Sequence, residues 1–496
     1  MGANSANITN ASALTISATA TGHGTDLLAG ASNSLSVTAS ADVTADASVG
    51  TGITQTATGG ASNSAAIVNS STLTISATGT ATGNNLDAVA SDASSAYANA
   101  WVSANASIGN GISQTAASAG TNSASINNSA TLSIVATADA TGNALNATGT
   151  SAPGITASAS ALASASIGVG ISQTASGGAS TASLTNTGTL DIKSISSAAG
   201  TDLVAVATIA SEASAQAGVW SAANVGQGVS QVAAGNSGSA TITNGASNAL
   251  TISATADATG SNLAANASAY SSASATAYVD GNAGVGQGVS QVASSATTAT
   301  TGITNSGTLS ITADAGAVGT GLAATATGSS ANGNGEAWVN ANANVGLGIA
   351  QTGAGGTGGA ADLTNNGSFT ISAIANAQGT DLAGQGNGSS ADGFASVDAH
   401  ANVGTGINQV GAGGSGTGSA SITNASGKTL SITSTATANG NGLAASASGN
   451  DASADASVSA TANLNTGINQ TGAPTTVVLK VTYSEPMDPM SQPTFT

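Results

Sequence analysis

The chain has 496 residues, a formal net charge of −18, no cysteine, and only three lysine or arginine residues. Those three, Lys193, Lys428 and Lys480, lie far apart, which excludes the clustered positive charge that nucleic-acid binding or attachment to an anionic membrane needs. The absence of cysteine excludes disulfides and thiolate metal sites, and no run of apolar residues is long enough to insert into a membrane.

A unit of about 59 residues is repeated eight times between residues 1 and 473. In each unit an asparagine at a fixed position closes a segment similar to Ile-Thr-Asn, and a glutamine recurs at a fixed position further along. The asparagines are Asn10, Asn69, Asn128, Asn186, Asn244, Asn305, Asn365 and Asn424. The glutamines are Gln55, Gln114, Gln173, Gln231, Gln291, Gln351, Gln409 and Gln470. Such regular spacing is typical of repeat proteins, in which a unit buries its apolar side only against its neighbours.

The first unit, read in chain order, predicts strands. Residues 8–20 alternate, with Ile8, Leu14 and Ile16 on one face and mostly Thr or Ser on the other. A Gly-x-x-Leu segment follows at residues 24–27 and recurs in every unit; we expect a corner there, because Gly, Asp and Asn tolerate positive φ. Residues 35–57 then alternate again, and alternation with a period of two is typical of a strand buried on one side.

These strands and corners predict an all-β fold, an elongated parallel β-solenoid of eight repeats. Two layouts fit the spacing. We favour three rungs of about 20 residues in each repeat, which gives roughly 24 rungs and a rod of about 115 Å. The alternative is one wide, flattened rung per repeat. A disordered chain is a further alternative for a sequence rich in Gly, Ser and Asn, but the strict placement of Leu, Ile and Val argues against it.

The recurring amides share the parity of buried residues. Gln55 lies on the face of Ile53, and Asn10 lies on the face of Ile8 and Leu14, so all sixteen amides are expected to point inward. A buried amide needs hydrogen-bond partners, and stacked Asn or Gln ladders supply them along a fibre axis. A polar ligand site is the alternative interpretation.

Two outward features are candidates for contact with other molecules. Trp101, Tyr278 and Trp338 each precede the glutamine of their unit by 13 residues, so they form a candidate contact stripe on the polar face. Scattered surface aromatics are nevertheless common. Rows of Thr and Ser, such as residues 15–21 and 74–82, resemble ice-binding surfaces, although plain strand propensity also explains them.

The segments of the form Asn-x-Gly-x-Leu-x-Ile at residues 186–192 and 305–311, and the segment at residues 365–371 with Phe369 in place of the leucine, resemble the rungs of filamentous-haemagglutinin and autotransporter-type adhesins. The resemblance covers residues 1 to about 473, although other repeats, such as residues 69–73, lack the glycine. It implies a right-handed parallel β-helix, secretion across the outer membrane, a location at the bacterial cell surface, and service as a stalk or adhesive rod.

Composition shifts at Pro474, and four of the five prolines follow from there. Residues 477–489 resemble the first strand and turn of a bacterial immunoglobulin-like domain. We therefore predict two regions, a solenoid over residues 1–473 and, over residues 474–496, a linker with the first strand of a truncated domain.

No arrangement of residues indicates catalysis, so we expect no enzyme activity and no cofactor. His23 and His400 occupy different phases of the repeat, and Asp398 with His400 supplies too few ligands for a metal. The glycine- and aspartate-rich nonapeptide of calcium-binding β-rolls is absent, so calcium has no support from a motif.

The sequence therefore predicts a structural and adhesive rod or stalk of an extracellular bacterial surface or matrix protein. A self-assembling fibre subunit is one alternative, and an ice- or glycan-binding solenoid is another. The expected partners are other copies of the chain, joined end to end or laterally, or surface glycans.

Overall fold

The structure is a computed structural model that describes residues 2–329, 332–414, 417–473 and 477–480. Within these ranges the chain forms 27 strands, which hydrogen-bond into one continuous parallel system, and it contains no helix. The prediction of an all-β parallel solenoid is therefore confirmed.

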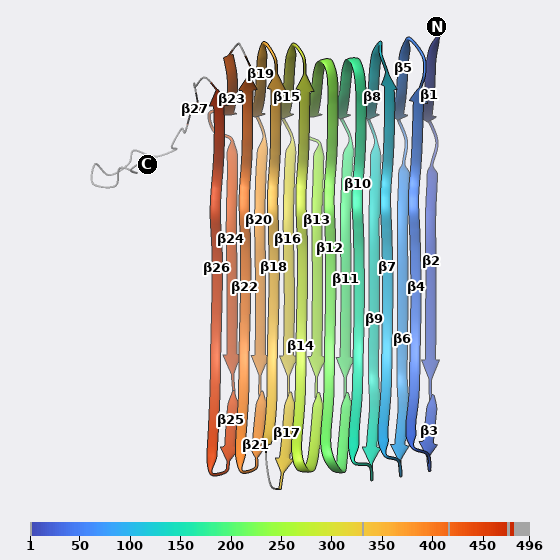
Figure 1. Cartoon of the computed structure of the whole chain (residues 1–496), viewed down its shortest axis with the longest axis vertical. Helices are drawn as coiled ribbons and strands as arrows, with labels where there is room; N and C mark the ends of the chain where they lie inside the picture. Colours follow the sequence, from blue (N-terminus) through green and yellow to red (C-terminus); the bar gives the residue numbers. More distant parts are fainter. Residues whose placement is uncertain (1, 330–331, 415–416, 474–476, 481–496) are drawn as a thin grey trace, which may run out of the picture.

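The first repeat shows the path that every repeat follows (Figure 1). Strands β1 (Ala3–Asn10), β2 (Leu14–Thr25) and β3 (Leu28–Ser32) run in one direction. The chain reverses after β3, and β4 (Ser36–Thr58) returns along the other side. We call the layer built from β1–β3 and their equivalents sheet A, and the layer built from β4 and its equivalents sheet B.

The strands of sheet A in later repeats are β5 (Ser62–Asn69), β6 (Leu73–Ser91), β8 (Thr121–Asn128), β9 (Thr131–Thr150), β11 (Thr189–Thr201), β13 (Ala249–Ser261), β15 (Thr298–Asn305), β16 (Thr308–Thr320), β17 (Ala323–Gly328), β19 (Gly358–Asn365), β20 (Ser368–Thr380), β21 (Ala383–Asn387), β23 (Thr417–Asn424), β24 (Thr429–Asn441), β25 (Ala444–Ser448) and β27 (Val477–Lys480). Sheet B continues through β7 (Ser95–Ser118), β18 (Asn332–Gly355), β22 (Ser390–Gly413) and β26 (Asp451–Ala473). Three long strands bend from one sheet into the other, namely β10 (Gly154–Asn186), β12 (Val204–Asn244) and β14 (Ala264–Ser295).

The register shows that each repeat makes one wide rung. Ile8 pairs with Ile67, and Gln55 pairs with Gln114, so each residue lies beside its copy in the next repeat. The favoured layout of three rungs per repeat, with its rod of about 115 Å, is therefore wrong, and the layout of one flattened rung is correct. Eight rungs stack to only about 38 Å, whereas the 23 residues of β4 extend over about 76 Å. The longest dimension of the molecule runs along the strands (Figure 1).

The physical reason lies in the Gly-x-x-Leu segment, which bends a strand without reversing it. Asp26 adopts φ 54°, and the equivalent residue of every repeat is also left-handed. One left-handed residue exchanges the inward and outward faces, so Leu14 and Ile16 point inward in β2 and Ala29 and Ala31 do so in β3. The chain continues in the same direction through this point, as the unbroken β6 and β9 show.

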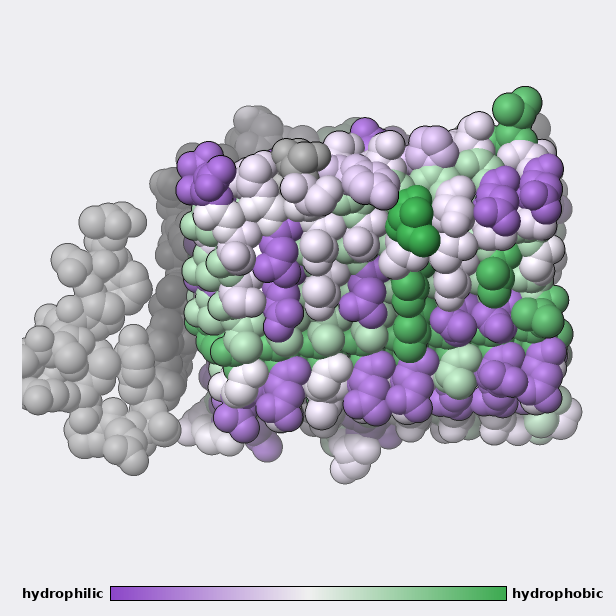
Figure 2. Space-filling view, turned by 90° about the horizontal axis from the view of Figure 1, so that it is seen from below, coloured by the Kyte–Doolittle hydropathy of each residue, from purple (hydrophilic) through white to green (hydrophobic). Residues whose placement is uncertain are grey.

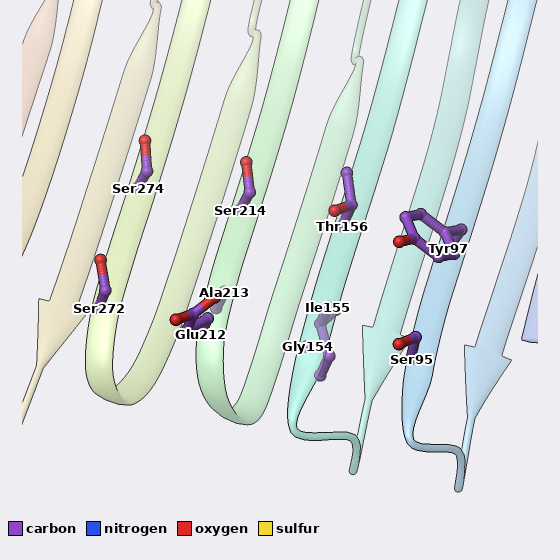
Figure 3. Close-up of a pocket in the computed structure, with 10 residues that line it drawn as sticks. All are labelled: Ser95, Tyr97, Gly154, Ile155, Thr156, Glu212, Ala213, Ser214, Ser272 and Ser274. Carbon is purple, nitrogen blue, oxygen red and sulfur yellow. The ribbon is translucent and has the colours of Figure 1, made fainter. Parts of the chain in front are cut away.

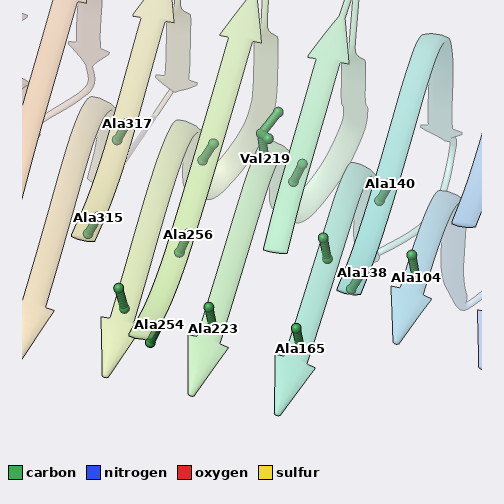
Figure 4. Close-up of a cluster of buried hydrophobic side chains, with 14 of the residues drawn as sticks. Ala104, Ala138, Ala140, Ala165, Val219, Ala223, Ala254, Ala256, Ala315 and Ala317 are labelled. Carbon is green, nitrogen blue, oxygen red and sulfur yellow. The ribbon is translucent and has the colours of Figure 1, made fainter. Parts of the chain in front are cut away.

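The two sheets pack face to face over a thin core. Strand β4 packs against both β2 and β6, so each strand of sheet B lies between two rungs of sheet A. The interior is mostly alanine, including the fully buried Ala138, Ala223 and Ala254 (Figure 4), with columns of Leu, Ile and Val. The small inward side chains let the sheets approach closely, because a Cβ atom on Gly79 of sheet A would lie 2.4 Å from the backbone oxygen of Asn105 in sheet B.

Glycine is required where a valine of the opposite sheet enters this narrow space. A Cβ atom on Gly260 would lie 2.4 Å from Cγ2 of Val279. The same pairing recurs in seven repeats, as Gly24 with Val43, Gly83 with Val102, Gly200 with Val219, Gly260 with Val279, Gly319 with Val339, Gly379 with Val397 and Gly440 with Val458. In the third repeat Gly142 faces the smaller Ala161. Glycine and valine thus interlock across the core.

The end of the molecule where β3 turns into β4 is a broad block in Figure 2, in which hydrophilic and small residues predominate and hydrophobic residues form separate clusters. Leu28 and Leu35, which flank that turn in the first repeat, are strongly exposed.

The region predicted as a linker and truncated domain is described only at β27. This strand pairs in parallel with β23, from Ala420 with Val477 to Thr423 with Lys480, and so continues the ladder of sheet A. The rest of that prediction, residues 474–476 and 481–496, lies outside the described residues.

Candidate functional site: amide ladders and an aromatic face

The recurring glutamines form one unbroken hydrogen-bonded column inside the solenoid. Nε2 of Gln114 donates to Oε1 of Gln55 at 2.7 Å, and the pattern repeats up to Gln470, which donates to Gln409 at 2.7 Å. The glutamines from Gln55 to Gln409 also donate to a backbone carbonyl of sheet A, as Gln231 does to Thr241 at 3.0 Å. The column therefore ties sheet B to sheet A.

The recurring asparagines form a second column, in which the hydrogen bonds point the other way. Nδ2 of Asn10 donates to Oδ1 of Asn69, in the following repeat, at 2.7 Å, and the same bond recurs up to Asn365 and Asn424. Within the columns, each glutamine from Gln114 onward donates to the glutamine of the preceding repeat, whereas each asparagine up to Asn365 donates to the asparagine of the following repeat. Because amide dipoles point from donor to acceptor, the two columns carry opposed dipoles.

Both columns are satisfied within the protein. Fourteen of the sixteen amides are buried, and the half-buried ones are Asn424 and Gln470, in the eighth repeat. Every one of the sixteen side-chain NH₂ groups donates to a protein acceptor; at Asn424 this is the carbonyl of Lys428. These groups are therefore committed to holding rungs in register, not to binding a ligand.

The candidate aromatic stripe lies on the outer face of sheet B. Trp101, Tyr278 and Trp338 occupy one rank across the strands, with Ser160 and Gly218 between the first two. The rings of Tyr278 and Trp338 stack at 5.0 Å with an interplanar angle of 18°. The structure thus brings Tyr278 and Trp338 together and leaves Trp101 three rungs away.

Tyr278 leans along the solenoid axis toward Trp101. A Cβ atom on Gly218 would lie 2.2 Å from Cζ of Tyr278, so glycine makes room for this ring. The Tyr278 hydroxyl hydrogen-bonds Ser160, while Nε1 of Trp101 donates to Oγ of Ser158 at 3.3 Å. Burial raises the pKa of Tyr278, the Ser160 hydrogen bond lowers it, and the charge of Asp280 raises it further. The aromatic side chains lie across small neighbours and cover them.

Three further aromatics on this face escaped the sequence analysis. Tyr97, Trp220 and Phe394 lie on neighbouring ranks of sheet B and precede their glutamines by 17, 11 and 15 residues. Each of them lies an odd number of residues before an inward glutamine, which places it on the outer face of the strand. This offset could have revealed them in the sequence. The other described aromatics are Phe369, which is fully buried, and Tyr270, which is exposed at a bend. The outer face of sheet A has no aromatic among its described residues.

Carboxylates gather on the same outer face. Nine lie there, namely Asp42, Asp46, Glu212, Asp280, Glu336, Asp392, Asp398, Asp451 and Asp455. Asp280 sits between Trp220 and Asn340 in the register. Burial raises the pKa of Asp280, and hydrogen bonds from Asn282 and Asn340 lower it. Lys193 lies on sheet A and Lys428 in a turn, so neither neutralises this face. We call this surface of sheet B, with its six aromatics and nine carboxylates, the aromatic face.

The outer face of sheet A carries the Thr and Ser rows. Thr15, Thr19 and Thr21 stand beside Thr74, Thr78 and Thr80 of the next rung. The rows are interrupted at Asp191 and Lys193, which form an ion pair of 3.0 Å. Burial raises the pKa of Asp257 on this face, and burial and then the charge of Asp257 raise the pKa of Asp314.

A shallow hollow crosses four rungs at the edge of the aromatic face (Figure 3). Tyr97 stands on one side, Glu212 lies further along, and Thr156 and Ser214 project between them. A second hollow of about 420 Å³ surrounds Phe394 and is also lined by Glu336, Asp392 and Asp455.

The histidines lie on different sheets. His23 is exposed on sheet A, and His400 is exposed on sheet B close to Asp398 in the same strand. Among the described residues, no group of three or more His, Cys, Asp or Glu side chains could hold a metal ion. Asp26 accepts a hydrogen bond from Asn85 at 2.6 Å, and Asp202 accepts one from Asn262 at 3.0 Å, so these bend residues pair with one another.

Comparison with family models, with curated proteins and with solved structures gave no match for this chain. No helix able to cross a membrane occurs in the ranges that the structure describes.

Proposed function

We propose that this chain is a non-enzymatic structural and adhesive segment of a secreted bacterial surface or extracellular-matrix protein. The observation that carries the proposal is the concentration of six aromatics on one outer face, where the core does not need them. Outward aromatics gathered on one surface are typical of contact sites, whereas scattered ones are not.

The scaffold suits this role because the hydrogen bonds that make it rigid do not involve its outward side chains. Parallel backbone ladders join all eight rungs, and two amide columns add side-chain hydrogen bonds along the same axis. Outward positions therefore change freely between repeats without loss of the fold, as the rank of Trp101, Ser160, Gly218 and Tyr278 illustrates. The segment is a flat slab that displays a face, in place of the narrow rod expected from the sequence.

The adhesive part of the proposal is tested with beads that carry the purified chain, whose retention on bacterial extracellular matrix is measured under flow. In the test variant, Trp101→Ser and Trp338→Ser introduce the residue that already occupies this rank at Ser160 and Ser396. We expect lower retention by a chain that remains folded.

The matched control removes two outward apolar residues from sheet A. Val135→Ser and Ile374→Thr introduce residue types already present in their ranks. Retention should be unchanged in this variant. Equal retention in wild type, test variant and control would reject the aromatic face as the adhesive surface.

A glycan-binding solenoid is the second candidate, and the hollow beside Tyr97 supports it. Sugars are bound by an aromatic ring with nearby hydroxyl and carboxylate groups, and Thr156, Ser214 and Glu212 supply these. Filling the hollow tests this candidate through Gly154→Gln, because a Cβ atom on Gly154 meets nothing within 4 Å. If a neutral oligosaccharide binds there, the substitution should abolish its binding.

A further inference from the structure

We propose that the aromatic face docks a polypeptide segment rich in lysine and arginine. This inference rests on the proposed adhesive function and names the chemistry of the partner.

The charge on this surface is one-sided. Nine carboxylates lie on it, and among the described residues no lysine or arginine balances them; His400 is the one basic side chain on the same strands. Carboxylates held in fixed ranks on a rigid sheet repel one another at low ionic strength, and a cationic partner relieves that repulsion. Complementary charge also speeds association of such a partner.

The aromatics add an attraction that is specific for cations. Lysine and arginine bind favourably over the faces of Trp and Tyr rings. Trp101 is 41% exposed, so much of its side chain is open to a partner. Tyr278 and Trp338 form an offset stack, and Asp280 and Glu336 lie two residues from Tyr278 and Trp338 along their strands. A cation there meets a ring and a carboxylate together.

The hollow around Phe394 provides a socket for one cationic side chain. Glu336 lies beside Phe394 in the preceding rung and Asp455 beside it in the following rung, while Asp392 is two residues earlier in the same strand. All three carboxylates and the ring line one hollow of about 420 Å³. An ammonium or guanidinium group in this hollow contacts the ring and is surrounded by negative charge.

An extended peptide lying along the strands matches the spacing of the face. Alternate side chains of a strand lie on the same side and recur about every 6.6–6.8 Å, which is also the spacing between ranks of sheet B. A second copy of this chain fits poorly, because its net charge of −18 repels an equally charged neighbour. A neutral glycan in the hollow beside Tyr97 would meet only Glu212 among the nine carboxylates, and it would leave their combined charge uncompensated.

The chain contains its own reporter for this face. Its three tryptophans, Trp101, Trp220 and Trp338, all lie on it. The experiment titrates wild-type chain with a hepta-lysine peptide at low salt and follows tryptophan fluorescence. We expect a saturable change that weakens as ionic strength rises. Chitotetraose and a hepta-glutamate peptide, titrated in parallel, should leave the fluorescence unchanged.

A pair of triple variants with equal charge separates site binding from general attraction. The test variant carries Glu336→Gln, Asp392→Asn and Asp455→Asn around Phe394. The control carries Asp139→Asn, Asp257→Asn and Asp314→Asn on the outer face of sheet A. The test variant should bind hepta-lysine about tenfold more weakly, and the control less than twofold more weakly.

Three results overturn the proposal: no saturable response to hepta-lysine, an equal loss in both triple variants, or a saturable response to chitotetraose alone. None of them decides the adhesive function, because the bead assay reads retention on matrix without reference to the chemistry of the partner. Loss of retention in the Trp101 and Trp338 variant, together with no response to hepta-lysine, would keep the proposed function and reject this partner.

Discussion

The glutamine column predicts that the same substitution has different costs at the centre and at the end of the stack. Gln231 is fully buried; it donates to Gln173 at 2.8 Å and accepts from Gln291 at 2.7 Å. Gln231→Leu keeps the size of the side chain but removes the donor to Oε1 of Gln173 and to the carbonyl of Thr241. Nε2 of Gln291 loses its shortest acceptor and keeps two longer hydrogen bonds to backbone carbonyls. Each unsatisfied buried group costs about 1–3 kcal/mol. Since a buried leucine offsets part of this, we expect a loss of about 2–4 kcal/mol.

Gln470→Leu is the matched comparison in the eighth repeat. Gln470 is half-buried at the end of the column, and the substitution removes a single hydrogen bond within the column, from Nε2 of Gln470 to Oε1 of Gln409. This change should cost only about 0.5–1.5 kcal/mol. Urea unfolding followed by far-ultraviolet circular dichroism measures both free energies. If the two substitutions cost the same within about 0.5 kcal/mol, the buried column does not stabilise the stack in the way argued above.

Two further predictions concern the core and the outer face of sheet A. Gly260→Ala should lower the free energy of unfolding by about 1–3 kcal/mol, because its Cβ would overlap Val279. Val279→Ala in the same chain should recover part of that loss, as the natural pair of Gly142 and Ala161 indicates. Additive losses in a double-mutant cycle would contradict the interlocking of the sheets. Burial raises the pKa of Asp257, so its contribution to stability is full below the unfolded value of 3.8 and is lost as the pH rises through the folded value. Asp257→Asn should therefore raise the melting temperature at pH 7 and leave it unchanged at pH 3, and an equal shift at both pH values would show that the charge is not responsible.

Alternation was the most informative signal in the sequence. Ile53 and Gln55 share a parity, as do Ile8 and Asn10, and the structure buries Ile53 and both amides. The register of the repeats also follows from the spacing, because neighbouring units place Gln114 directly beside Gln55. Backbone pleating links odd and even positions to opposite faces, so such statements need only the period.

The width of the rung, in contrast, did not follow from alternation or from the spacing of the repeats. A left-handed residue can belong to a turn that reverses the chain or to a point where a strand only exchanges its faces, and the alternation on either side does not distinguish the two. The structure resolves this through packing, since Val43 needs Gly24 opposite it and β2 therefore continues straight into β3. The residues that lie beside Trp220 and Phe394 in neighbouring rungs depend on the width of the rung, so the sequence could not predict them either.

The amino-acid sequence by itself determined that this protein is a parallel β repeat, and which side chains of each strand face inward, because both follow from a period of two within a period of about 59. Only the tertiary structure decided that the repeat closes as one flat rung, and that the aromatics and carboxylates of seven repeats gather on a single face. Those outcomes depend on how two sheets with a thin alanine core fit together, which is a property of contacts between distant residues and not of any local pattern.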